Sequence, residues 1–204
     1  MHTARQPPWA VPPALASELQ LAYATPPRAY HSWHHINEVL GWFDRVAEAE
    51  LWRDPLPPFA AILFHDAIYV AGQPDNEIRS AQLARHSLLQ HAWPGSADQL
   101  NRVLELIELT AQHGKLDAAD VDGDAALFLD CDTAILAASA PVFDAYDAAI
   151  ANEYQHVPAA AYRAGRSYFL RGLLHRPRIF LSEFFHRELD STARNNLTRI
   201  LQRY

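Results

Sequence analysis

The sequence predicts an all-α protein, a single-domain bundle of about eight or nine helices, on three observations. Apolar residues recur at three- and four-residue intervals along several long stretches, which is the spacing of one face of a helix. Proline-rich segments separate these stretches and end the helices they follow. The chain contains no alternating apolar–polar run, internal repeat or composition shift that would indicate a sheet or a linker between domains.

In the first half of the chain, residues 1–13 are proline-rich and predict an irregular N-terminal arm, while residues 14–204 predict the helical domain. Pro26 and Pro27 interrupt helical geometry, and so does the segment 54–58. Asp75 or Asn76 is a plausible N-cap for the fourth helix. The helices expected here cover residues 14–23, about 32–51, 59–69 and about 75–91.

In the second half, capping residues and prolines set most of the expected boundaries. Ser96 predicts an N-cap, Gly114 predicts the residue that follows a helix, and Pro141 and Pro158 suit the starts of two helices. The aspartate-rich segment 115–124 predicts an exposed loop. The expected helices cover residues 100–113, 125–139, 141 to about 154, 158 to about 174, and 182–202.

Composition narrows the class of protein. The 204 residues carry a formal net charge of -7, and no dense basic cluster predicts binding to a nucleic acid polymer. The single cysteine, Cys131, excludes an internal disulfide and is expected to be a small core residue. The first residues lack the apolar segment of a signal peptide, and no apolar run is long enough to span a bilayer. We therefore expect a cytoplasmic protein without membrane association.

The stretch 59–69 is the most informative, because an apolar run ends there in an adjacent imidazole and carboxylate, His65 and Asp66. Burying such a pair is costly unless a cation, a proton or dense hydrogen bonding compensates for the lost water. Two His with two carboxylates suit Mn²⁺, Fe²⁺, Co²⁺ or Ni²⁺ better than a sulfur-rich structural zinc site would. The other candidate ligands are His31, His34 and His35 at the start of the second helix, and Asp130 and Asp132 in the 125–139 helix.

The ordered pattern His…His-Asp…Asp resembles the HD-domain superfamily of metal-dependent phosphohydrolases. Further segments are similar to a subfamily of predicted HD phosphohydrolases of about this size, and the resemblance covers roughly residues 20–200. It implies a helical domain of the HD type. The segments are 28–36 (RAYHSWHHI), 64–69 (FHDAIY), 75–81 (DNEIRSA), 128–136 (FLDCDTAIL), 153–154 (EY), 162–166 (YRAGR) and 193–197 (ARNNL).

The resemblance implies one divalent metal ion, whose identity among Mn, Fe, Co, Ni, Mg and Zn stays open. His35 is preferred to His31 as the first ligand, because Val39 and Phe43 follow it at the spacing that the superfamily shows. Asp132 is preferred to Asp130 for its aliphatic sequel, and a helix points the two apart, so at most one of them should be a ligand. The implied metal ligands are His35, His65, Asp66 and Asp132.

Two catalytic residues and three substrate-binding residues are expected around that ion. Asp66 could orient a water molecule that the metal activates, and Glu77 could act as general acid/base. The alternative for Glu77 is a plain charge at a helix N-terminus. Arg79 is a candidate phosphate clamp, with a solvated arginine as its alternative. The remaining substrate-binding candidates are His31 and His113, either of which could also serve a second metal.

The expected function is therefore that of a metal-dependent phosphohydrolase acting on a small phosphorylated molecule, a nucleotide or another phosphate ester. One alternative is a non-catalytic HD-type module that binds a metal or ligand. Another is a helical scaffold whose polar cluster is a hydrogen-bonded knot. Substrate identity stays open, and so does oligomeric state, since the final helix could contribute to the core or to a homodimer contact.

Overall fold

The computed structural model describes residues 7–25 and 28–204, and within those ranges the protein is all-helical, as predicted. Nine α-helices and three short 3₁₀ helices run through the described residues, which contain no strand. These residues divide into two compact units. The first unit comprises residues 7–25 and 31–111, and the second comprises residues 28–30 and 112–204. The expectation that residues 14–204 form one domain stays a prediction.

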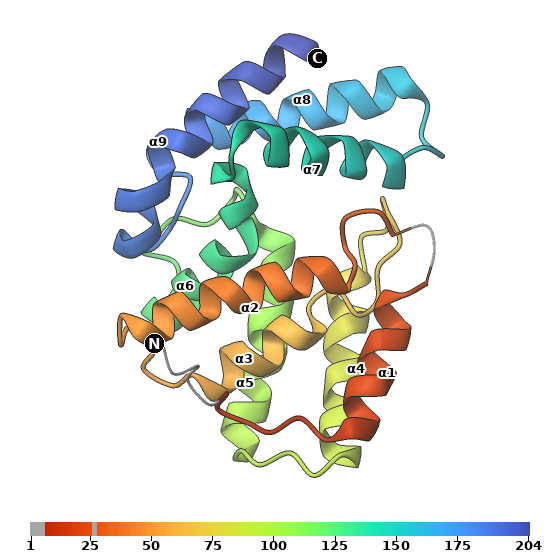
Figure 1. Ribbon diagram of the computed structural model, residues 1–204, viewed down its shortest axis with the longest axis vertical. Coiled ribbons are helices and arrows are strands. Elements are labelled where there is room, and N and C mark those ends of the chain that lie inside the picture. Colours follow the sequence, from red (N-terminus) through yellow and green to blue (C-terminus); the bar gives the residue numbers. More distant parts are fainter. Residues whose placement is uncertain (1–6, 26–27) are drawn as a thin grey trace. The chain divides into compact units, whose positions relative to one another are not determined.

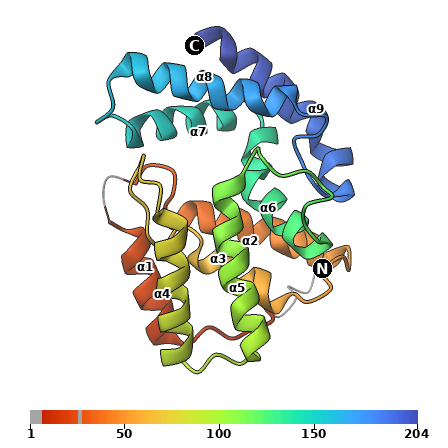
Figure 2. The same ribbon diagram turned by 180° about the vertical axis from the view of Figure 1, so that it is seen from behind.

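The first unit is built around α3, which packs against α2, α4 and α5 (Figures 1 and 2). Every residue from Pro57 to Phe64 is buried, so this run is enclosed on most sides. Residues 7–12 precede α1 without regular structure, whereas residues 1–6 of the predicted arm and the break at 26–27 lie outside the described residues. The helices are α1 (Pro13–Tyr23), α2 (Trp33–Glu48), α3 (Leu56–Phe64), α4 (Asn76–Gln90) and α5 (Ala97–Leu109).

The predicted bounds of α3, residues 59–69, were wrong at both ends. The helix begins at Leu56 because Pro57 and Pro58 fall in its first turn, where backbone N–H groups have no partner within the helix and proline loses nothing. It ends at Phe64, and His65 caps it. Side chains of α4 form hydrogen bonds with the segment that follows and hold it in a non-helical conformation. The hydrophobic periodicity of the segment itself gives no sign of these hydrogen bonds.

The second unit is built around α9, which packs against α6, α7, α8 and η2. Residues 28–30 belong to it because the buried carboxylate of Glu153 accepts hydrogen bonds from the N–H groups of Ala29 and Tyr30, both at 2.8 Å. Cys131 is buried, as expected. The α-helices of this unit are α6 (Gly123–Thr133), α7 (Ala140–Glu153), α8 (Ala159–His175) and α9 (Glu183–Ile200), joined by the 3₁₀ helix η2 (Ala134–Ala137) and followed by η3 (Leu201–Arg203).

Capping chemistry explains several of the remaining boundaries. Ser96 forms a reciprocal capping box with Gln99 at the start of α5, and Gly114 has the positive φ of 74° expected after a helix. Two predicted helices end earlier than expected because their last turns tighten into 3₁₀ geometry. The 100–113 helix becomes α5 followed by η1 (Thr110–Gln112), and the 125–139 helix becomes α6 followed by η2.

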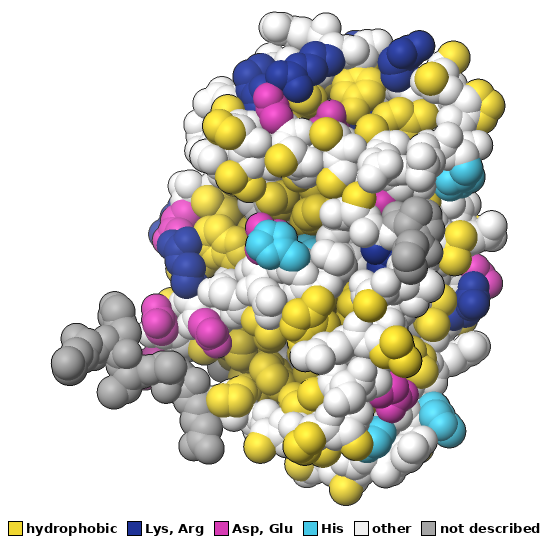
Figure 3. All heavy atoms as spheres, turned by 45° about the vertical axis from the view of Figure 1, so that its right-hand side comes forward, with side chains coloured by type: hydrophobic (Ala, Val, Ile, Leu, Met, Phe, Trp, Pro, Cys, Tyr) yellow, Lys and Arg dark blue, Asp and Glu magenta, His cyan; other side chains and the backbone are white. Residues whose placement is uncertain are grey.

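Two further features bear on possible partners: the length and hydropathy of the helices, and the distribution of basic side chains on the face that Figure 3 shows. No single helix of the described residues is long and apolar enough to cross a membrane. One pair of consecutive helical segments in the described residues, Gly123–Ala137 and Ala140–Glu153, reaches that length and hydropathy only when taken together, and it is bent by 105°. In Figure 3 the Lys and Arg side chains lie in separate groups among hydrophobic and acidic ones.

Candidate metal centre

His65 stands where the apolar helix α3 ends, and its side chain is buried, with 1% exposed. Its Nδ1 atom lies 2.9 Å from the carbonyl oxygen of Ile62, one turn earlier. A carbonyl oxygen only accepts hydrogen bonds, so Nδ1 carries the proton in this contact. In the neutral ring the Nε2 atom then keeps its lone pair, which is the arrangement of a histidine that binds a metal through Nε2.

The Nε2 atom of His65 faces two further candidate ligands in the first unit. His35, buried on α2, places its own Nε2 atom 3.2 Å away. Asp66 places Oδ2 3.1 Å from His65 Nε2 and 3.7 Å from His35 Nε2. The structure therefore brings three of the four predicted ligands, His35, His65 and Asp66, close together within this unit.

These three atoms need a positive charge or a proton among them. A neutral His65 Nε2 and an ionised Asp66 Oδ2 both present lone pairs, and at 3.1 Å such atoms repel each other unless something positive lies between them. Two ligand atoms held about 2.1 Å from one ion, at an angle of about 90–110°, lie about 3.0–3.4 Å apart. The two separations from His65 Nε2, 3.2 and 3.1 Å, fit that spacing, whereas the 3.7 Å between His35 Nε2 and Asp66 Oδ2 is longer and needs a wider angle.

The donor set also fits a divalent ion chemically. Two imidazole nitrogens and a carboxylate oxygen suit first-row transition metals. The carboxylate of Asp66 is only 16% exposed, so an ion there would replace hydration that the site has already lost. A shared proton is the alternative, and it would make the cluster a hydrogen-bonded knot.

The fourth predicted ligand, Asp132, belongs to the second unit and is paired there. Its Oδ2 atom lies 2.7 Å from Nε2 of His113, which follows η1. Nothing in the sequence signals this pair. The pair directs the His113 ring to a carboxylate, whereas the role expected for this residue was substrate binding.

Asp130 and Asp132 are close in sequence, but their carboxylates contact different groups. Its buried carboxylate accepts hydrogen bonds from the Leu181 N–H at 2.7 Å, the Ser182 N–H at 2.7 Å and the Ser182 hydroxyl at 2.6 Å. Burial raises the pKa of Asp130 to about 7, while the hydrogen bonds from Ser182 and Leu181 oppose that rise. Both oxygens are thus engaged by the chain between α8 and α9, which supports the preference for Asp132 as a ligand.

The other predicted catalytic and substrate-binding residues of the first unit are half-buried or exposed. The ring of His31 stacks on Tyr69, with centroids 3.9 Å apart, and its centroid lies 6.1 Å from that of His35. Glu77 is half-buried in the first turn of α4, and Arg79 is exposed on the same helix. Within the described part of the chain, neither of these two side chains has a hydrogen bond or ion pair. His31 is therefore the substrate-binding candidate that lies beside a candidate metal ligand, His35.

Two residues that fix the segment after Asp66 were missed. Asn76 was considered only as a cap, but its buried amide accepts from Val70 N–H at 3.0 Å and donates to the carbonyls of Val70 at 2.9 Å and Gln73 at 3.2 Å. Ser80 accepts from Ile68 N–H at 3.0 Å and donates to Ile68 O at 3.1 Å. Their one sequence signal was that both fall in the segment 75–81, which carried part of the resemblance.

Comparisons of this chain with protein families, with curated proteins and with solved structures give no match.

Proposed function

We propose that this protein is a metal-dependent phosphohydrolase that acts on a small phosphorylated molecule, a nucleotide or another phosphate ester. The observation that carries the proposal is the convergence of His35 Nε2, His65 Nε2 and Asp66 Oδ2 at the buried end of α3. The ordered His…His-Asp…Asp pattern supports it from the sequence.

His35, His65 and Asp66 would hold the ion, and the resemblance adds Asp132 as the fourth ligand. A divalent ion bound there lowers the pKa of a water molecule and neutralises charge on a phosphoryl group. The protein supplies the fixed geometry: the hydrogen bond from His65 Nδ1 to Ile62 O holds the ring so that Nε2 faces inward. Burial of both imidazoles keeps competing water away.

Asp66 is proposed to orient the attacking water, because its carboxylate is partly exposed whereas both histidines are buried. Glu77, half-buried at the start of α4, is proposed to deliver a proton to the leaving oxygen. His31 and Arg79 are proposed to bind the phosphorylated substrate. His31 is held in place by its stack on Tyr69, and Arg79 presents an exposed guanidinium able to bind two phosphate oxygens.

The test is a panel of aryl phosphate mono- and diesters and nucleotides, assayed with Mn²⁺, Co²⁺, Ni²⁺ and Mg²⁺. We expect metal-dependent hydrolysis by the wild-type protein. Asp66→Ala should lose bound metal and more than about 100-fold in turnover, because both a ligand and the orientation of the nucleophile are removed. Asp44→Ala is the matched control, since it removes an exposed carboxylate of α2.

Two outcomes would contradict the proposal. Full metal occupancy and full activity in Asp66→Ala would show that the ligands are assigned wrongly. A metal-saturated wild-type protein that hydrolyses no member of the panel would favour the non-catalytic binding module instead.

A further inference from the structure

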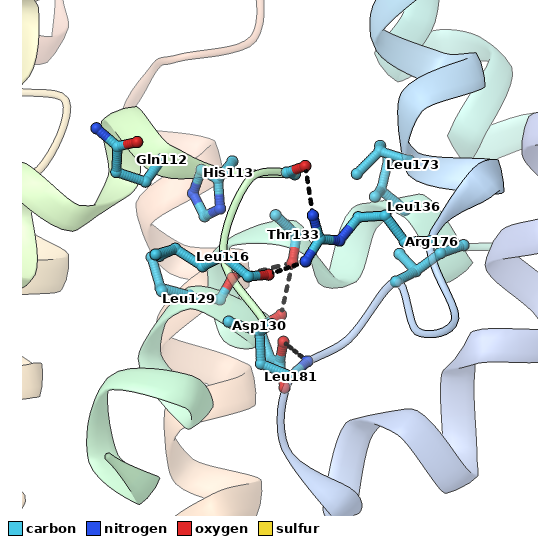
Figure 4. Close-up of a pocket in the computed structure, with 12 residues that line it drawn as sticks. Gln112, His113, Leu116, Leu129, Asp130, Thr133, Leu136, Leu173, Arg176 and Leu181 are labelled. Atoms are coloured by element: carbon cyan, nitrogen blue, oxygen red, sulfur yellow. Dashed lines mark hydrogen bonds between the residues drawn. The ribbon is translucent and has the colours of Figure 1, made fainter. Parts of the chain in front are cut away.

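The chain that follows His113 is tied to the end of α8 by one arginine. Arg176, the C-cap of α8, donates hydrogen bonds to the carbonyl oxygen of Gly114 at 2.9 Å and to that of Leu116. It also pairs with the carboxylate of Asp117. Its side chain is only 16% exposed, and Figure 4 shows it reaching across to the loop that carries these carbonyls.

The hydrogen bonds of Arg176 hold a short loop, residues 114–117, whose backbone is already constrained. Gly114 has a φ of 74°, and a Cβ added there would lie 3.2 Å from a methyl of Leu173 on α8, so the chain turns sharply against that helix. His113 is the residue immediately before this turn. Its position is therefore fixed from one side by η1 and from the other by the hydrogen bonds of Arg176.

Holding the loop in place affects the contact that the His113 ring makes with Asp132. Nε2 of His113 lies 2.7 Å from Oδ2 of Asp132, which stands near the end of α6. Behind the loop is a cavity of about 20 Å³, lined by His113, Asp130, Thr133 and Arg176 among others (Figure 4). That volume is about the space of one water molecule, so truncating Arg176 would open room for water beside His113.

We propose that Arg176 is a positioning residue: it fixes the 114–117 loop so that His113 stays hydrogen bonded to Asp132, and through His113 it sets the orientation of that carboxylate. The inference rests on the proposed function for the role of Asp132 as a metal ligand. Partners that orient a ligand from outside are worth about 10–100-fold in metal affinity. An arginine is required because its planar guanidinium reaches several acceptors at once, which an ammonium group does less well.

The first experiment reads the position of His113 without any metal. In metal-stripped protein, the ¹⁵N chemical shifts of the His113 ring report whether Nε2–H donates to Asp132. We expect Arg176→Ala to lose the hydrogen-bonded signal that the wild type shows. Arg178→Ala is the matched control, because that arginine lies two residues on, pairs with Glu183 at the surface, and should leave the signal unchanged.

The second experiment measures the dissociation constant of Co²⁺ for the same proteins and for His113→Ala. We expect Arg176→Ala and His113→Ala each to weaken Co²⁺ binding about 10–100-fold, and the double variant to lose no more than His113→Ala alone. Multiplied losses in the double variant would mean that Arg176 does not act through His113, and would overturn the proposal.

The two readouts separate this inference from the proposed function. A wild-type protein that binds no Co²⁺ refutes the proposed function, and the ring signal then decides the positioning claim. An unchanged His113 signal in Arg176→Ala refutes the positioning claim whether or not metal binds. Should Arg176→Ala fail to fold, Arg176→Lys, which keeps the charge and the aliphatic stem, takes its place and should shift the signal in the same direction.

Discussion

Replacing Asn76 with alanine should destabilise the protein by removing the side chain that fastens the segment after Asp66. Three hydrogen bonds disappear, with separations of 3.0, 2.9 and 3.2 Å. Each such bond contributes about 0.5–1.5 kcal/mol net, and the exposed position of Val70 lets water recover part of the loss. We expect a free energy of unfolding lower by about 2–3 kcal/mol.

For a chain of this size, that loss corresponds to a decrease in melting temperature of about 5–10 °C. The measurement is urea and thermal unfolding of metal-stripped protein followed by circular dichroism. Asp75→Ala is the matched control, because the adjacent Asp75 is exposed and its side chain makes no capping hydrogen bond. It should change the free energy of unfolding by less than about 0.5 kcal/mol.

The reasoning would be refuted if Asn76→Ala were as stable as the wild type, or if Asp75→Ala lost as much stability as Asn76→Ala. A second consequence concerns metal affinity. Since the fastened segment begins next to Asp66, Asn76→Ala should also bind Co²⁺ more weakly than Asp75→Ala does. Equal affinities would limit Asn76 to a purely structural role.

Three further predictions concern single side chains. Ser96→Ala breaks the capping box of α5 and should lower the free energy of unfolding by about 1 kcal/mol; unchanged thermal unfolding would contradict this. Burial raises the pKa of Asp190, but hydrogen bonds from the Ile179 N–H and Arg194, together with the nearby His186 ring, outweigh it and hold that pKa below its ordinary value of 3.8. A lowered carboxyl pKa stabilises the fold above the unfolded pKa and loses that effect as pH falls, so Asp190→Asn should be less stable than wild type at pH 7, with a gap that closes below about pH 4. Burial raises the pKa of the Cys131 thiol, so iodoacetamide should label Cys131 only in denaturant, and rapid labelling of the folded protein would refute its burial.

The features that sequence reasoning predicted well are those that local patterns determine. Helical periodicity and capping residues located most helices, because the Ser96 box and the turn at Gly114 depend on residues a few positions apart. The meeting of His65 and Asp66 followed from their adjacency, and that of His35 with them came from the ordered pattern of the resemblance.

The features that it missed depend on side chains that bond to backbone groups outside their own helix. Asn76 and Ser80 on α4 form hydrogen bonds with the backbone of the loop that precedes that helix. Arg176 donates hydrogen bonds to carbonyl groups about 60 residues earlier in the chain. Such bonds leave no period in the sequence. No change of composition accompanies the division into two compact units. The early start of α3 was missed because Pro57 and Pro58 were taken as helix breakers and not as first-turn residues.

The central claim is that His35 and His65 hold one metal ion together. Titration of metal-stripped protein with Co²⁺, followed by its visible absorption, tests it most directly. Wild type should bind about one equivalent with a spectrum of nitrogen and oxygen ligands, and His35→Ala and His65→Ala should each bind at least about tenfold more weakly. A wild-type protein that binds no Co²⁺, or histidine variants that bind it as tightly as wild type, would contradict the claim and leave a hydrogen-bonded knot in its place.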